Sequence, residues 1–126
     1  MIVSKEHIIK YFNSGIRNAN QFKIGIEHEK FLFDLNTNKR VDYQTILKMF
    51  KGLYEFGWKP ILENKNIIGL KKNGKSITLE PGNQVELSGD QLNNIHEACL
   101  ESQDYLFEIK QAIKKLNLKI VSAGFD

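Results

Sequence analysis

Hydrophobic and polar residues alternate along residues 22–35 (FKIGIEHEKFLFDL), which predicts a strand with two different faces. The segment is rich in β-branched and aromatic residues, as strands are. Successive side chains of a strand point to opposite faces, so Glu27 and Glu29 share one face and His28 lies on the other. The sequence therefore places two carboxylates together on this strand.

The dipeptide Asn73-Gly74 predicts a tight hairpin between strands at residues 67–72 and 75–80. Both turn positions of a type I′ hairpin need positive φ, which Asn and Gly tolerate. In this register Leu70 lies opposite Ile77 on the buried face. Glu80 then projects from the opposite, polar face.

A third alternating segment follows the predicted type II turn at Pro81-Gly82. Its apolar residues are Val85 and Leu87, and the polar side chains between them share one face: Gln84, Glu86 and Ser88. Asn83, beside the turn, either holds a positive φ or directs backbone donors at an anion.

Apolar residues spaced three and four apart predict three helices. The expected spans are residues 4–13, capped by Ser4; 42–57, capped by Asp42; and 90–116, capped by Asp90. The stripe expected to be buried on the long helix is Leu92, Ile95, Cys99, Ser102, Leu106, Ile109, Ile113 and Leu116. Asn117 ends that helix, a strand begins at Leu118, and Pro60 confines a short strand at 58–62 to a sheet edge.

These elements predict an α+β fold, an antiparallel sheet with helices packed on one face, in a single domain spanning residues 1–126. Composition agrees: 41% hydrophobic and 26% charged residues are usual for a soluble globular protein. No segment approaches the roughly 18 apolar residues that a membrane helix needs, so we expect no membrane partner. Without a signal-peptide pattern, and with Cys99 as its single cysteine, the chain is expected to be cytoplasmic.

The formal net charge of +3 is too small to indicate a nucleic-acid surface. The lysines are scattered, with groups at Lys71, Lys72 and Lys75 and at Lys110, Lys114 and Lys115. They are not interleaved with aromatic residues as in single-strand binders. We therefore expect no nucleic-acid partner.

Four glutamates, at positions 27, 29, 80 and 86, are expected on one face of the sheet. Carboxylate oxygens are ligands for Mg²⁺, which usually takes one or two of them together with phosphate oxygens and water. The alternative is an ordinary solvated strand face, with Glu27 and Glu29 paired to Lys23 or Lys30. His28 and His96 are expected to be packed histidines rather than ligands.

Four segments, in this order and spacing, resemble the plant-type glutamate-cysteine ligase family, which also occurs in proteobacteria. They are residues 22–31 (FKIGIEHEKF), 66–71 (NIIGLK), 76–89 (SITLEPGNQVELSG) and 95–99 (IHEAC). The resemblance implies a glutamine synthetase-like catalytic fold and the first step of glutathione synthesis. ATP would phosphorylate the γ-carboxylate of L-glutamate, and the amine of L-cysteine would displace phosphate to give γ-glutamylcysteine.

The resemblance also assigns roles to residues. Glu27, Glu29, Glu80 and Glu86 would hold Mg²⁺ at the nucleotide site, with ATP as a substrate, and Gln84 and Ser88 would contact substrate or phosphate. Phosphoryl transfer of this kind needs no side-chain nucleophile, so no catalytic residue is assigned.

Two departures from the family pattern matter. The family usually has Glu-Pro-Gly-Gly-Gln where this chain has Asn83, and its enzymes are several times longer. We therefore expect a truncated chain, the N-terminal part of the catalytic domain, that is inactive or nearly so alone. The alternatives are a non-catalytic metal- or nucleotide-binding module, or a subunit of a split ligase. A third interpretation is that the stripe on the long helix mediates self-association.

Overall fold

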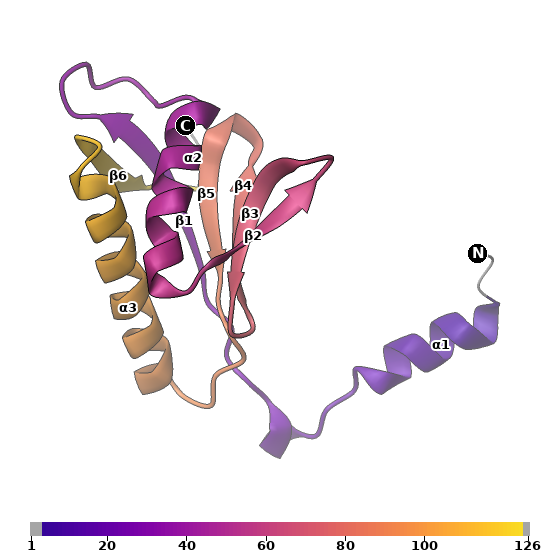
Figure 1. Ribbon diagram of the computed structural model, residues 1–126. Coiled ribbons are helices and arrows are strands. Elements are labelled where there is room, and N and C mark those ends of the chain that lie inside the picture. The colour runs from indigo at the N-terminus through magenta and orange to yellow at the C-terminus, as the bar shows by residue number, and fades with distance from the viewer. Residues whose placement is uncertain (1–3, 125–126) are drawn as a thin grey trace.

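Strands β2-β3-β4-β5-β1-β6, in that order, form one sheet in the computed structural model, which describes residues 4–124 (Figure 1). Every pairing in the sheet is antiparallel. The strands are β1 (Glu27–Asp34), β2 (Lys59–Glu63), β3 (Asn66–Lys72), β4 (Lys75–Glu80), β5 (Gln84–Ser88) and β6 (Leu118–Ser122). The predicted antiparallel sheet is confirmed. Its relationship to the glutamine synthetase-like fold stays a prediction.

Two helices, α2 (Tyr43–Gly52) and α3 (Ile95–Lys114), cover one face of the sheet (Figure 1). The core lies between them and the sheet, and its fully buried members include Leu32, Ile46, Phe50, Leu70, Ile77, Val85, Leu87 and Ile109. Asp42 caps α2 as predicted, and a short 3₁₀ turn (Leu53–Phe56) continues it to Gly57, where φ is +88°. The predicted α+β arrangement is confirmed.

The β3–β4 hairpin turns at Asn73 and Gly74, whose φ angles are +46° and +84°. Leu70 pairs with Ile77, which is the predicted register. Gly82 and Asn83 also have positive φ, and the Asn83 amide donates to the carbonyl oxygen of Val41 at 3.3 Å. Asn83 thus holds a backbone conformation that glycine would adopt without strain.

The first strand begins at Glu27 rather than at Phe22, so the predicted N-terminal boundary is wrong. Glu27 pairs with Ser88, the last residue of β5, and no strand continues beside the preceding residues. Residues 22–26 make one isolated bridge, between Ile24 and Leu92. Alternation in the sequence did not reveal that the neighbouring strand stops.

The long helix begins later than predicted, because Asn94 rather than Asp90 is its cap. The Asn94 side chain accepts from the backbone N–H groups of His96 and Glu97, whereas Leu92 is held in the bridge to Ile24. With 20 residues the helix is about 30 Å long.

The buried face of α3 also differs from the predicted stripe. Its buried residues are Ala98, Glu101, Tyr105, Glu108, Ile109, Ala112 and Ile113, while Cys99 and Ile95 are exposed. Both buried glutamates have partners, so polar residues occupy positions that an apolar-only pattern excludes. Because Cys99 is exposed, its expected burial is wrong. His96, also on α3, is exposed rather than packed.

Helix α1 (Lys5–Ser14) is capped by Ser4 as predicted, but none of its residues is buried. Figure 1 shows it projecting away from the sheet. At the other end of the chain, Asn117 has a φ of +56° and β6 pairs with β1, as predicted. No helix within residues 4–124 is long and apolar enough to cross a membrane.

Replacing Gly69 by alanine is expected to destabilise the sheet by about 1–3 kcal/mol, because the added methyl group would press against the backbone of the neighbouring strand. A Cβ at Gly69 would lie 2.6 Å from the backbone carbonyl oxygen of Ile77, which cannot move without breaking the β3–β4 pairing. The matched control is Gly25→Ala, where a Cβ would meet nothing within 4 Å. Urea unfolding of both variants measures the effect, and equal stabilities would contradict this account.

Candidate metal and nucleotide site

Cross-strand pairing places the four glutamates on one face of the sheet. Glu29 pairs with Glu86 of β5, and Glu86 pairs with Thr78 of β4. Residues directly opposite one another in an antiparallel sheet point to the same side. Glu27 and Glu80 belong to the neighbouring rows and keep the same orientation, since strand side chains alternate. We call this surface, which faces away from α2 and α3, the polar face.

Glu86 lies at the centre of this arrangement. Burial raises its pKa, and the negative charges of Glu80, Glu27 and Glu29 raise it further, in that order. A hydrogen bond with Ser88 opposes the rise. Each of the other three carboxylates is thus close enough to Glu86 to make its ionisation less favourable.

The surroundings of the acidic residues are open. Glu27 and Glu29 line a hollow of about 490 Å³ whose opposite wall is Ser122, Ala123 and Gly124. Glu27 also lines a second hollow of about 250 Å³, with Ser88 and Gly89. A small ligand can therefore reach Glu27 from either hollow and Glu29 from the larger one.

Gln84 is 7% exposed, and its amide nitrogen donates to the carbonyl oxygens of Ala123 at 2.9 Å and Gly124 at 3.1 Å. This side chain ties the end of β6 to β5. Its predicted contact with substrate stays a prediction, as does that of Ser88, which lies opposite Glu27. Glu80 accepts a hydrogen bond from the Thr78 hydroxyl at 3.0 Å.

His28 lies on the helix-covered face, as predicted. Its Nε2 is 2.9 Å from the Ser102 hydroxyl, and its ring centroid is 6.0 Å from that of Tyr105. Burial lowers its pKa, and the charge of Lys30 lowers it further, whereas Glu101 raises it. His28 is thus a packed histidine, neutral over more of the pH range than a free one.

The two lysines that could have neutralised Glu27 and Glu29 form hydrogen bonds elsewhere. Lys30 is 4% exposed on the helix-covered face and donates to the Ser122 hydroxyl at 2.9 Å. Lys23 donates to the Asn93 side chain. The alternative that pairs Glu27 and Glu29 with these two lysines is therefore not supported.

The fit to a cation depends on how many carboxylates each ion needs. Within residues 4–124, no three Asp, Glu, His or Cys side chains lie close enough to hold one metal ion. The facing pair Glu29 and Glu86 supplies two hard oxygen ligands. That number suits Mg²⁺, which completes its shell with phosphate oxygens and water. The polar face therefore fits a metal bound together with a phosphate ligand.

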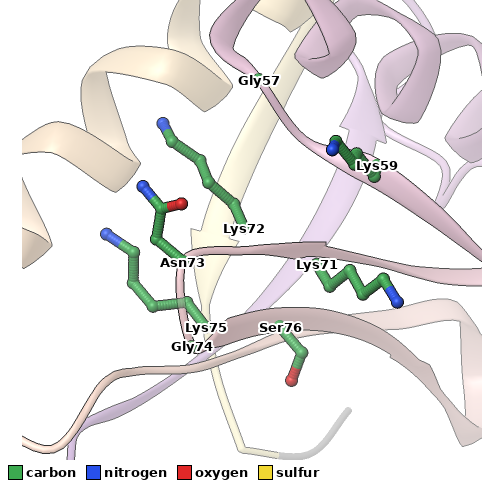
Figure 2. A pocket seen from close by; sticks show the side chains of 8 residues that line it. All are labelled: Gly57, Lys59, Lys71, Lys72, Asn73, Gly74, Lys75 and Ser76. Carbon is green, nitrogen blue, oxygen red and sulfur yellow. The ribbon is translucent and has the colours of Figure 1, made fainter.

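A basic hollow of about 420 Å³ at the end of the β3–β4 hairpin was missed in the sequence (Figure 2). It is lined by Gly57, Lys59, Lys71, Lys72, Asn73, Gly74, Lys75 and Ser76. Three of its lysines flank the hairpin turn in the sequence, but Lys59 joins them only through the pairing of β2 with β3. The sequence shows the three lysines around the turn. It does not show the register of the irregular edge strand that brings Lys59 beside them.

Sequence comparisons show the family of the chain. A family model described as glutamate-cysteine ligase family 2 matches residues 23–126, which include every strand. The chain belongs to this family. It is 37% identical to the chloroplastic glutamate-cysteine ligases of Nicotiana tabacum and Arabidopsis thaliana, and 38% identical to ligase A of Oryza sativa subsp. japonica, over 98% of its own length. The chain spans about a quarter of the length of these relatives.

Replacing Glu86 by glutamine is expected to stabilise the folded chain at pH 7 without divalent cations. The raised pKa means that folding opposes ionisation of Glu86, so the wild type loses stability as pH rises through that pKa. Glutamine removes this penalty, and like-charge pairs across strands predict a gain of up to about 1 kcal/mol.

The gain should shrink as the pH falls below 4.5, the ordinary value for this glutamate, because Glu86 is then protonated in both states. Urea unfolding at pH 7 and below pH 4.5 tests this, with Glu63→Gln on the exposed edge of β2 as the matched control. An E86Q variant less stable than the wild type at pH 7 would show that the carboxylates do not repel one another.

Proposed function

We propose that this chain forms the acidic wall of the nucleotide site of a glutamate-cysteine ligase, where ATP and Mg²⁺ meet L-glutamate. The proposal is supported chiefly by the convergence of Glu27, Glu29 and Glu80 on Glu86. Membership of the family and 37–38% identity to enzymes named glutamate-cysteine ligase add to this support. The reaction forms γ-glutamylcysteine and is the first step of glutathione biosynthesis.

The carboxylates would hold Mg²⁺ on the polar face, with at most two of them to each ion and phosphate oxygens and water completing the shell. Bound Mg²⁺ neutralises charge on phosphate oxygens during phosphoryl transfer. The glutamates themselves position the ion and, once it is bound, no longer repel one another. ATP would phosphorylate the γ-carboxylate of L-glutamate, and the L-cysteine amine would then displace phosphate, so the protein needs no nucleophile of its own.

Two further expectations belong to this proposal. Ser88, beside Glu27 and Glu86, would contact substrate or phosphate, whereas Gln84 would act mainly by fixing the end of β6. The relatives are named as chloroplastic enzymes, and a cytoplasmic location for this chain stays a prediction.

Binding of ATP by this chain should be tighter with Mg²⁺ than without it, because the free nucleotide and the four carboxylates of the polar face are both anionic. Isothermal titration calorimetry with ATP, in Mg²⁺ and then in EDTA, measures this dependence. Replacing Glu29 by glutamine should weaken binding of the Mg²⁺ complex roughly tenfold, as is usual when a metal site loses part of its shell. Glu63→Gln, on the edge strand β2 and three strands away from β5, should leave it unchanged. Equal affinity with and without Mg²⁺, or no effect of E29Q, would contradict the proposal.

A second candidate function is a non-catalytic module or a subunit of a split ligase, and it is favoured by the chain spanning only a quarter of its relatives' length. Incubation with MgATP, L-glutamate and L-cysteine separates the two candidates. Formation of γ-glutamylcysteine that falls in a Glu27→Gln variant would support the ligase. A ligase fragment alone is expected to be inactive or nearly so. Saturable MgATP binding without product would therefore support the module only if a version extended past Asp126 also forms no product.

A further inference from the structure

The lysine-lined hollow at the hairpin end contains two kinds of lysine. Lys72 is 2.5 Å from Glu108 and lies over the Trp58 ring, and Lys75 is 3.5 Å from Glu101. These two lysines are neutralised by glutamates of α3 and fasten the hairpin to the helix layer. Figure 2 shows both reaching to the same side of the hairpin, with Asn73.

Lys59 and Lys71 lie on the other side of the sheet and lack such partners. They are exposed, and no ion pair between residues of the described segment 4–124 involves either one. They are also directly opposite each other in the β2–β3 pairing. Like charges at such positions repel and weaken the sheet unless an anion lies between them.

Protection of the sheet edge does not account for both lysines. A lysine on an edge strand discourages pairing with other chains, and this explains Lys59 on β2. Lys71 is on β3, which has neighbours on both sides. Its position opposite Lys59 therefore needs another reason.

The two lysines belong to the same row of residues as the acidic site. Pairing continues from Lys59 to Lys71, then to Ser76, Ser88 and Glu27. All five side chains therefore lie on the polar face. The row runs from two cations through two hydroxyl groups to a carboxylate.

We propose that Lys59 and Lys71, with Ser76, bind the phosphate chain of an oligophosphate ligand whose other end reaches the carboxylates. This inference rests on the proposed function, because it extends the same nucleotide site across the sheet. Ammonium and hydroxyl groups are donors to phosphate oxygens. Gly57 also lines the hollow, and a Cβ there would meet nothing within 4 Å, so the ligand has space beside the lysines.

The dimensions of the row suit an extended anion. Three strand spacings separate Lys71 from Glu27, which corresponds to about 14 Å between backbones. A lysine side chain leaning toward Glu27 would shorten this distance to about the length of a triphosphate rather than of a single phosphate. A monophosphate could touch the lysines or the acidic end, but not both.

Mg²⁺-free inorganic tripolyphosphate is the probe that isolates the lysine end of this row. Calorimetry with the 126-residue chain should detect saturable binding, because the lysines attract the anion without a metal. The double substitution K59Q/K71Q should weaken it roughly tenfold, since it removes two charge-assisted contacts. The matched control K10Q/K110Q removes the same charge from exposed sites on α1 and α3 and should change affinity by less than about twofold.

Equal weakening in the two double variants, or no saturable binding by the wild type, would overturn the lysine site. Urea unfolding checks the fold, and K59Q/K71Q should be at least as stable as the wild type because a like-charge pair is removed.

The double substitution E29Q/E86Q distinguishes this inference from the proposed function. It should leave tripolyphosphate binding unchanged or tighter, because it removes negative charge from the polar face. Metal-dependent ATP binding should fall in the same variant. Failure of the lysine site would leave that second result intact, and failure of the acidic site would leave the first.

Discussion

Pairing between β1 and β5 is the constraint on which the candidate site depends, because it sets Glu29 opposite Glu86. A slip of one residue would turn every side chain of β1 to the other face. The glutamates would then be pressed against α3, and Phe31 would lose the place where it is now 4% exposed beneath Arg40. The register is fixed from the opposite side of the strand, where Leu32 is buried in the core and His28 bonds Ser102. The alternation of side chains along β1 therefore determines both the core packing and the geometry of the site.

The helix layer supports the polar face through buried charge as well as through apolar contact. Glu108 accepts hydrogen bonds from the Trp58 indole at 2.6 Å and from Lys72 at 2.5 Å. Glu101 accepts from the Asp90 backbone N–H and faces Lys75. Removing one partner of such a buried pair leaves an uncompensated charge. These bonds fix the hairpin end against α3, so the strands that carry Lys71 and Ser76 keep a defined position relative to β5.

The sequence was sufficient for features determined by neighbouring residues. The Asn73-Gly74 turn, the left-handed Asn117 and the orientation of Glu27 against His28 all follow from local backbone preference or strict alternation. It was insufficient where distant partners decide the outcome. The start of β1 depends on where β5 ends, and burial of Glu101 and Glu108 depends on Asp90, Lys72 and Trp58. The pair Lys59 and Lys71 arises from the pairing of β2, which shifts register between Ile61 and Leu62. The sequence therefore predicted the acidic half of the candidate site and missed the basic half.

The polar face combines two arrangements that each oppose folding when no ligand is bound. Four carboxylates converge at one end, where they raise the pKa of Glu86, and two lysines face each other at the other end. Separated by two strands carrying serines, the opposite charges do not form contact ion pairs across the row. A ligand with a cation at one end and phosphate oxygens along its length would relieve both repulsions at once, and any such relief adds to its affinity. The unfavourable charge distribution of the free chain is thus the physical basis on which the polar face would select a metal-bound oligophosphate over either ion alone.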